Sequence, residues 1–590
     1  MKPISRSIRF LTPAALVLSL VAGCASAPDN GANHTGAGTA APLVRSTAYG
    51  KVEGTSDGNG AYFWKGIPFA KPPVGQLRWK APVEPDAWNA TFQATRFGNA
   101  CAQYGRIYGP GANNTYDATI GTTLNQPVGS EDCLTLNIWR PADADTNLPV
   151  IYFIYGGSNV SGYTGDPVYD GAALAKLAHA VVVTANYRVG ALGWFDLAQL
   201  KRGTSILDDS GNFGTLDQVQ TLKFINKNIG NFGGNSGNVT LMGESAGAIN
   251  LYALLTSPLV VNTKPQLFHR AIALSGGFAL PTDLPPGTFP LVRPESFALA
   301  QGKKLLNALL IADGKASDDA TAETYIASQS DAQIADYVRS KTTGEIFKQW
   351  LTTLAKSGLA ITSHIPDGNV VSSSPIAAIK AGNYLKVPIL ASNTREEGKL
   401  FSHFLALSPA WGGKSGFIVS DPARFDMMMK FDPNAATNLS VNDIIAPSYL
   451  PTDEPVTGYN ARTGLLSQAV FYSSRDVTLN ALKSKQDNVW YFMFAWNNEP
   501  APWNEVYGAA HLLDVPFEFG NFGPSVFSRV MGGEANKAGR LALSSAMMHS
   551  IAAFAKNGDP NNASLGTSWP TWPQTLIFDA TLTEKKISVK

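Results

Sequence analysis

The segment Gly243-Glu-Ser-Ala-Gly247 places a serine between two glycines. A Gly-x-Ser-x-Gly pattern is typical of a sharp turn between a strand and a helix, which lifts the serine hydroxyl clear of the backbone. The glycines are needed because side chains at their positions would collide with neighbouring strands. The turn also points the amide of Ala246 toward the hydroxyl, where it can stabilise a negative charge. The pattern predicts a nucleophile at Ser245, with a structural glycine turn as the alternative.

A serine attacks only when a base removes its proton and a carboxylate orients that base. The candidate bases are 7 histidines, which are scattered singly along the chain. Neither they nor the cysteines lie at the spacing of metal ligands. We therefore expect no metal, and the chemistry of an activated serine implies no cofactor.

The elements around this segment suit the motif. Short, nearly continuous apolar runs are typical of strands covered on both faces, as in a mostly parallel sheet. They lie at 150–154, 180–184, 239–242, 271–274 and 387–391. Across 216–229, apolar residues recur every three or four positions, as on a helix. The alternation predicts an α/β fold with a large, mostly parallel sheet flanked by helices, and the strand 239–242 ends directly before Gly243.

A different composition marks residues 400–465, which lack a strand rhythm. This stretch contains apolar residues such as Trp411, Phe417 and Met427 to Met429. We interpret it as a helical cap over the sheet rather than as an independent domain.

Longer stretches of the chain resemble the type-B carboxylesterase/lipase family. The run Phe232 to Gly247 is similar to the serine-site signature of that family, and Glu131 to Pro141 is similar to its second signature. Further similar segments are 63–70, 186–193, 217–218 and 558–561, so the resemblance covers about residues 44–590. It implies one catalytic domain with the α/β-hydrolase fold and helical cap insertions.

The resemblance also implies the partners of Ser245. The segment Ser392 to Gly398 resembles the acid loop of the family, which places the acid at Glu397; Glu396 and Asp367 are the competing carboxylates. The segment Ala510 to Gly520 matches the base motif and implies His511 as the base, with His403 as its nearest competitor. The chain order serine, acid, histidine is the one expected for this fold.

The donors to an oxyanion follow from the same resemblance. By position they are the backbone amides of Gly157, Ser158 and Ala246. Ser158 stands where the family commonly has glycine. Its side chain narrows the part of the site that would hold the acyl group of an ester, and it disfavours a positive φ angle. Glu244 and Ser275 match positions that join hydrogen bonds around the histidine, although both could equally be structural polar residues under the turn.

The first 24 residues are typical of an export signal. Lys2, Arg6 and Arg9 precede the apolar stretch from Phe10 to Gly23. The segment ends at Cys24 in a sequence that resembles the lipobox of bacterial lipoproteins, which implies lipidation of Cys24; cleavage after Ala27 is the alternative. Residues 25–43 have the composition of a flexible tether. We expect an exported protein that is lipid-anchored to the bacterial outer membrane, or otherwise periplasmic or secreted.

Export bears on the redox state of the remaining two cysteines. In an oxidising compartment Cys101 and Cys133 are expected to form a disulfide, with two free buried thiols as the alternative. Its loop of about 32 residues would stabilise the fold by roughly 3–4 kcal/mol.

Composition excludes other classes of protein. A net charge of +1 with 15% charged residues argues against a nucleic-acid partner, which needs a basic face. Beyond the first 25 residues no apolar run is long enough to predict a membrane-spanning helix, so contact with a membrane is expected only through the N-terminal lipid. The oligomeric state cannot be read from these patterns.

The prediction is therefore a serine carboxylic-ester hydrolase acting on a small-molecule ester through a Ser-His-Glu triad and an acyl-enzyme. A lipase and a non-catalytic binding or adhesion relative are the alternatives. A cholinesterase is less favoured: between Cys101 and Cys133 the chain has Tyr104, Tyr108 and Tyr116 but no tryptophan to hold a quaternary ammonium group. The identity of the ester stays open.

Overall fold

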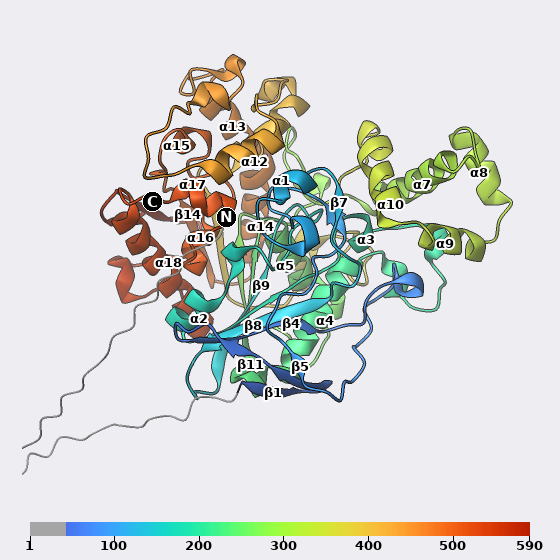
Figure 1. Ribbon diagram of the computed structural model, residues 1–590, viewed down its shortest axis with the longest axis horizontal. Helices are drawn as coiled ribbons and strands as arrows, with labels where there is room; N and C mark the ends of the chain where they lie inside the picture. The colour runs from blue at the N-terminus through green and yellow to red at the C-terminus, as the bar shows by residue number, and fades with distance from the viewer. Residues whose placement is uncertain (1–42) are drawn as a thin grey trace, which may run out of the picture. The chain divides into compact units, whose positions relative to one another are not determined.

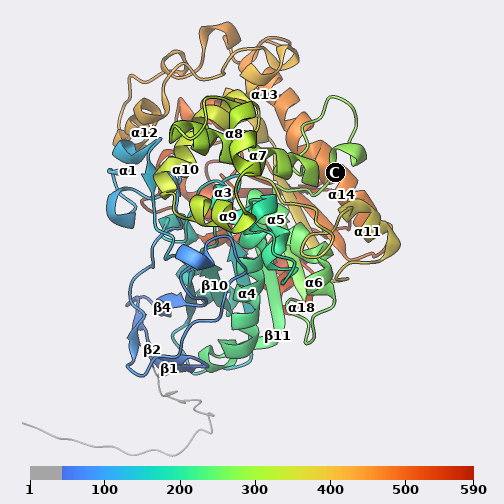
Figure 2. The same ribbon diagram turned by 90° about the vertical axis from the view of Figure 1, so that its right-hand side faces the viewer.

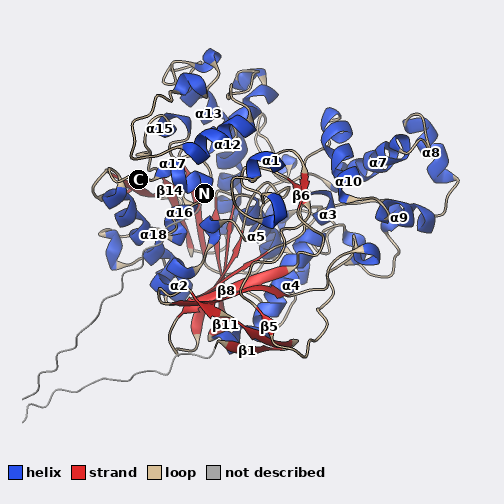
Figure 3. Ribbon diagram, in the orientation of Figure 1, coloured by secondary structure: helices blue, strands red, loops and turns tan. Residues whose placement is uncertain are grey.

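The computed structural model describes residues 43–590, whose centre is a mixed sheet of 11 strands (Figure 3). Its order is β16-β15-β14-β13-β12-β11-β9-β10-β8-β4-β3. The strands are β3 (Thr55–Ser56), β4 (Ala61–Pro68), β8 (Thr135–Pro141), β9 (Leu148–Ile154), β10 (Val181–Ala185), β11 (Gly234–Glu244), β12 (Arg270–Leu274), β13 (Ile389–Thr394), β14 (Val489–Phe494), β15 (Leu576–Ala580) and β16 (Lys585–Val589). All pairs from β10 to β15 are parallel, and antiparallel pairs form the two margins.

The five predicted strands coincide with β9 to β13, which confirms the mostly parallel sheet. All five residues of β10 and all six of β13 are buried, as expected for strands covered on both faces. Two smaller sheets lie outside the main one. They consist of β1 (Val44–Thr47), β2 (Gly50–Glu53) and β5 (Phe92–Gln93), and of β6 (Gln103–Tyr104) and β7 (Pro127–Val128).

Helices cover both faces of the sheet (Figures 1 and 2). On one face α2 packs against α16 and α18, and α18 contacts β9, β11 and β15; on the other, α5 contacts α4 and α11, and α11 contacts α14. Their bounds are α2 (Ala172–Ala178), α4 (Phe213–Asn228), α5 (Ala246–Thr256), α11 (Pro375–Ala381), α14 (Ser473–Lys483), α16 (Val515–Phe519) and α18 (Lys537–Asn557). The helix predicted across 216–229 is thus α4.

Two helical insertions follow strands of the sheet. Residues 400–465 form short 3₁₀ turns, α12 (Asp421–Lys430) and most of α13 (Tyr459–Ser467), which agrees with the predicted helical character. A second helical group, which stands together in Figure 1, was not predicted from the sequence. It consists of α7 (Glu295–Ala312), α8 (Asp319–Ala327), α9 (Asp331–Arg339) and α10 (Thr343–Gln349).

The sheet gathers the candidate site at the carboxyl ends of its strands. Tyr155 to Ser158 follow β9, Ser245 follows β11, and Ser275 follows β12. Glu397 lies in the turn after β13. In parallel strands these ends meet at one edge, so residues far apart in the chain come together there.

Two predictions concern the N-terminal residues of the chain. The export signal with Cys24, and all of the tether except residue 43, lie outside the described residues. Within residues 43–590, no helix combines the length and the apolar character that a membrane span requires.

Candidate active site

Ser245 occupies the strained turn that the motif predicts. It caps α5 with a φ angle of 57° and a ψ angle of −123°, which L-residues rarely adopt, and its amide donates to Leu274 O at 2.9 Å. A Cβ atom on Gly243 would collide with the carbonyl of Gly247, and one on Gly247 with the carbonyl of Ile154. Crowding on both sides of the turn therefore explains the two glycines.

Glu397 and His511 form a buried pair. The imidazole Nδ1 lies 2.5 Å from Glu397 Oε2. The other carboxylate oxygen, Oε1, accepts hydrogen bonds from the Asn393 side chain at 2.7 Å and from the Thr394 amide at 3.0 Å. Burial alone would raise the pKa of Glu397. The charge of His511 and the surrounding hydrogen bonds outweigh burial, so the pKa lies below its usual value and the carboxylate stays ionised.

The competing acids have other partners. Glu396 forms an ion pair with Lys399 at 2.7 Å and accepts from the amide of Ala509 at 2.9 Å. Asp367 accepts from the amides of Val370 and Val371 in its own turn. Of the three candidate carboxylates, only Glu397 contacts the imidazole of His511.

Ser245 and His511 line the same small cavity, which has a volume of about 20 Å³. Gly157, Ser158 and Glu244 line it as well. Among the described residues, the Ser245 hydroxyl makes no hydrogen bond to His511; the imidazole Nε2 lies instead 3.1 Å from Glu244 Oε1. Catalytic hydrogen bonds often close only when substrate binds, so this geometry is compatible with proton transfer from Ser245.

Two of the predicted oxyanion donors, Gly157 and Ser158, border this cavity, and the third, Ala246, lines a larger one that also contains Ser245. The φ angles of Gly157 and Ser158 are 96° and 56°, so Ser158 adopts the left-handed conformation that its side chain disfavours. A Cβ atom on Gly157 would collide with the carbonyl of Ser161, which explains the glycine there. Among residues 43–590, the amides of Gly157 and Ser158 have no acceptor and are free for a ligand.

Glu244 and Ser275 lie beside the acid and the base. Burial, followed by the charge of Glu397, raises the pKa of Glu244 well above its usual value. Ser275 is among the groups that lower the pKa of Glu397. Both residues thus take part in the electrostatics of the site, and Glu244 contacts His511 directly.

A larger cavity of about 560 Å³ opens onto Ser245. Both helical insertions contribute to its wall: the segment after β12 supplies Phe289, Phe347 and Trp350, and the cap supplies Phe404 and Arg424. Such a mostly apolar space with a few polar groups is typical of a site for a small molecule.

Comparison with known proteins shows the family of the chain. A model of the carboxylesterase family matches residues 41–587. The chain belongs to the carboxylesterase family. It is 29% identical over 552 residues to the para-nitrobenzyl esterase of Bacillus subtilis, covering 92% of this chain and 95% of that protein. It is also 29% identical to the acetylcholinesterase of Electrophorus electricus, over 90% of this chain and 83% of the relative.

Solved structures extend this similarity to the fold. A para-nitrobenzyl esterase superimposes with a TM-score of 0.68 at 26% identity, over 93% of this chain and 97% of that structure. The fold is that of an α/β-hydrolase, and this member of the carboxylesterase family is a carboxylic ester hydrolase.

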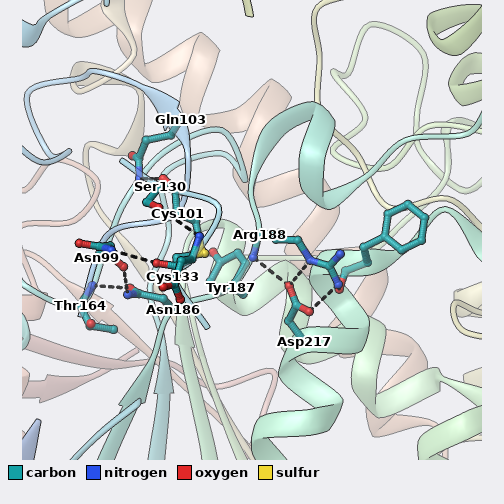
Figure 4. Close-up of a disulfide and its surroundings, with 12 residues drawn as sticks. Asn99, Cys101, Gln103, Ser130, Cys133, Thr164, Asn186, Tyr187, Arg188 and Asp217 are labelled. Carbon is teal, nitrogen blue, oxygen red and sulfur yellow. Dashed lines mark hydrogen bonds and ion pairs between the residues drawn. A yellow bond between two sulfur atoms is a disulfide. The ribbon is translucent and has the colours of Figure 1, made fainter. Parts of the chain in front are cut away.

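The disulfide of this carboxylesterase joins Cys101 to Cys133, as predicted, with 4.9 Å between their Cα atoms (Figure 4). Beside it, Asn186 accepts from the amide of Thr164 at 3.0 Å and donates to Asn99 O at 2.9 Å. These bonds tie the loop to the sheet. The figure also shows the ion pair of Arg188 with Asp217, from two of the family-like segments.

Sequence reasoning missed two features around His511. The rings of Phe401 and Phe471 pack on the imidazole with centroids 4.9 and 4.8 Å away, which shields it from water. Asp514 and Glu518 are buried nearby, and their carboxylate oxygens have no partner among the described residues. Burial, followed by the charges of Glu244 and Glu397, raises the pKa of Asp514 to about 8.

The other histidines play different parts. His403 and His364 both line the large cavity, and burial lowers their pKa values to about 4 and about 3. His364 packs between Trp194 and Phe278, as a packing residue would. His179 meets two aspartates, the half-buried Asp143 and the exposed Asp145, in the described part of the chain. Arg140 already pairs with Asp143 at 2.6 Å, so this trio is explained as an ion-pair cluster.

Proposed function

We propose that the chain hydrolyses carboxylic esters through an acyl-enzyme on Ser245, with His511 as the base and Glu397 as the acid. The supporting observation is the 2.5 Å contact between His511 and Glu397 at the wall of the cavity that also holds Ser245. An ionised carboxylate on Nδ1 keeps the proton there, so Nε2 presents its lone pair as a base.

The reaction has two matching halves. His511 Nε2 takes the proton of Ser245 as Oγ attacks the ester carbonyl, and the oxyanion accepts from the amides of Gly157, Ser158 and Ala246. The tetrahedral intermediate collapses, the C–O bond to the alcohol breaks, and His511 returns the proton to that alcohol. Water then attacks the acyl-enzyme by the same route and releases the acid.

Electrostatics favours this sequence. The imidazolium forms against the ionised carboxylate of Glu397, so its positive charge is stabilised where it appears. Glu244, on the other side of the ring, adds a second negative charge only at a pH high enough to ionise it. The packed rings of Phe401 and Phe471 keep the local dielectric low, which strengthens these interactions. Each oxyanion donor is worth about 3–4 kcal/mol of barrier in comparable sites.

The test is hydrolysis of para-nitrophenyl acetate by wild type and Ser245→Ala, together with covalent labelling by a fluorescent alkylphosphonate. We expect Ser245→Ala to lose at least about 10³-fold in kcat and all labelling. Retention of full turnover by Ser245→Ala contradicts the mechanism. Absence of labelling in folded wild type favours the non-catalytic binding relative instead.

A lipase is the second candidate, and the cap favours it. The segment 400–465 lines the large cavity with Phe401 and Phe404, so apolar chains have a surface to contact. Turnover of emulsified tributyrin above that of a soluble ester of equal acyl length supports a lipase; a preference for the soluble ester supports an esterase.

We also propose export and lipid attachment at Cys24, on the support of the sequence alone. The measurement is detergent phase partition of the full chain expressed in a bacterium. Wild type is expected in the detergent phase and Cys24→Ala in the aqueous phase; equal partition contradicts lipidation.

A further inference from the structure

Two arginines line the large cavity that opens onto Ser245. They are Arg106, from the loop closed by the disulfide, and Arg424, from α12 in the cap. Besides them, Asp421 is the only aspartate or glutamate on the described wall of this cavity. The ionised side chains of that wall therefore leave one net positive charge in a space that is otherwise largely apolar.

Arg424 is buried but incompletely bonded. It is 5% exposed, and its Nη2 donates to Asp421 Oδ1 at 2.8 Å. Its Nε and Nη1 atoms have no acceptor among residues 43–590. The guanidinium lies over the ring of Phe417 at 4.1 Å, which holds its plane in place. Buried donors without a partner are unfavourable, so an acceptor that reached them from the cavity would be bound favourably.

Arg106 is a second free cation at the same wall. It is half-buried, its guanidinium lies 6.0 Å from the ring centroid of Tyr104, and no ion pair of the described chain includes it. Both arginines lie near His403 and the phenol of Tyr108, because the charges of both contribute to the pKa values of these two groups. His403 is neutral at pH 7 because burial, together with Arg424, lowers its pKa to about 4. It can therefore add a neutral hydrogen bond without changing the sign of the wall.

Tyr108 connects this wall to the reacting atoms. It lines both the large cavity and the small one that holds His511. Its ring lies against Gly157, since a Cβ atom on that glycine would be 3.5 Å from Tyr108 Cε2. Tyr108 is thus next to one proposed oxyanion donor and on the same cavity wall as both arginines, so a spacer lying along this wall would join the reacting ester to the guanidinium groups.

We propose that the substrate is an ester that carries a carboxylate at a distance from the scissile bond, and that Arg424 and Arg106 bind this carboxylate. The inference rests on the proposed ester hydrolysis and adds the substrate class to it. A planar carboxylate matches the guanidinium fork, and the spacer would lie along the apolar wall. A cationic ester would meet net positive charge, which disfavours a quaternary ammonium substrate.

Three para-nitrophenyl esters with the same alkyl spacer test the inference: the half-ester of pimelic acid, the corresponding ester of pimelic acid monoamide, and an analogue that ends in trimethylammonium. A second series carries the same three end groups on the alcohol side of an acetate ester. We expect kcat/KM for the carboxylate to exceed that for the carboxamide by about tenfold or more in one series, with the cation poorest. The preference should shrink at high salt.

Variants assign the preference to residues. Arg424→Gln and Arg106→Gln should each lower the carboxylate-to-carboxamide ratio about tenfold, whereas Asp421→Asn should raise it by removing the negative charge. Arg462→Gln is the matched control, because Arg462 is half-buried, donates to Ala410 O at 2.8 Å and does not line the cavity. Inhibition of carboxamide-ester hydrolysis by pimelate, but not by its diamide, gives a readout of binding alone.

The same experiments distinguish failure of the anionic substrate class from failure of the proposed ester hydrolysis. If the carboxamide esters are hydrolysed but neither series prefers the carboxylate, or if the ratio is the same in Arg424→Gln, Arg106→Gln and wild type, the anionic substrate class is wrong and ester hydrolysis stands. If folded wild type hydrolyses none of the esters and does not react with the phosphonate, the proposed function fails and the substrate class falls with it.

Discussion

The imidazole Nε2 of His511 lies 3.1 Å from Glu244 Oε1, so the side chain directly before the proposed nucleophile reaches the nitrogen that must take its proton. Both residues are at most 2% exposed. Because burial raises the pKa of Glu244, this carboxyl holds its proton to higher pH than an exposed one does. Glu244 therefore changes from a neutral neighbour to an anionic one as the pH rises.

The first prediction concerns Glu244→Gln. An anion beside His511 stabilises the imidazolium that forms in the transition state, so kcat of wild type should rise as Glu244 ionises. Glutamine imitates only the protonated form. We expect Glu244→Gln to match wild type within about threefold at low pH and to fall about tenfold behind above the pKa of Glu244, a difference of about 1.4 kcal/mol. The measurement is a pH profile of kcat; parallel profiles contradict it.

The second prediction concerns Glu397→Gln. If the new amide oxygen keeps the bonds from Asn393 and Thr394, its NH₂ group points at His511 Nδ1. The imidazole must then accept at Nδ1 and carry its proton on Nε2, which is the wrong tautomer for a base. We expect kcat to fall by about 10³–10⁴-fold with the thermal midpoint little changed.

Glu396→Gln is the control for that substitution, because Glu396 is adjacent in sequence but pairs with Lys399. Its kcat should stay within tenfold of wild type. Equal losses in the two variants would mean that the acid is not assigned to Glu397.

The third prediction concerns Ser158→Gly. Ser158 is held at a φ angle of 56°, where glycine has no steric penalty. The substitution should raise stability by up to about 1 kcal/mol, less the greater entropy of glycine in the unfolded chain. Ser158 borders both cavities, so loss of its side chain also widens the acyl side. A rise in kcat/KM for hexanoate relative to acetate esters checks this; an unchanged ratio shows that Ser158 does not limit the acyl group.

The sequence predicted the sheet and much of the candidate site because those features have local signals. Buried parallel strands are continuous apolar runs, and the turn at Ser245 requires glycines at fixed positions. The segment from 295 to 349 has amphipathic helices without strands between them. The apolar strand runs that located the other elements are therefore missing there, and these helices were not predicted. Its capping boxes, Ser330 with Gln333 and Thr342 with Glu345, were signals that could have located α9 and α10.

Side-chain surroundings could not be predicted in the same way. Asp514 and Glu518 follow His511 in a short segment whose acidic residues resemble those of a surface helix, yet both are buried. Phe401 and His511 are more than a hundred residues apart, and their contact depends on how the cap folds back over the sheet. Such contacts arise from tertiary packing, which has no local pattern.

The fourth prediction concerns Asp514 and the pH dependence of stability. The folded state keeps the proton of Asp514 up to pH about 8, whereas the unfolded chain releases it near pH 4. Between these values the folded state binds more protons, so the free energy of unfolding falls as the pH rises. Asp514→Asn removes this loss.

We therefore expect the free energy of unfolding of Asp514→Asn, measured from thermal melts, to gain on that of wild type progressively from pH 5 to 8, by at least about 1 kcal/mol in all. Asp487→Asn is the control, because the Asp487 side chain is 96% exposed. A constant difference between Asp514→Asn and wild type across the range contradicts the raised pKa.

The fifth prediction concerns the disulfide, which closes a loop that contributes Tyr104, Arg106 and Tyr108 to the large cavity. Replacing Cys101 and Cys133 by serine should lower the free energy of unfolding by about 3–4 kcal/mol, because the unfolded chain regains the entropy of the open loop. Ser245, Glu397 and His511 all lie outside this loop, on elements at the edge of the sheet. KM should therefore rise several-fold while kcat stays within about threefold, measured well below the thermal midpoint.

The double serine variant separates the effect of the loop on substrate binding, seen in KM, from any effect on the reacting groups at the sheet edge, seen in kcat. Wild type treated with a reductant provides the control, since it should reproduce the higher KM if the bond itself holds the loop in place. The backbone pairing of Ala102 with Ser130 at 2.9 Å remains in both, so the loop is loosened rather than released. A fall in kcat at unchanged KM would mean that the loop supports the reacting groups and not the cavity wall.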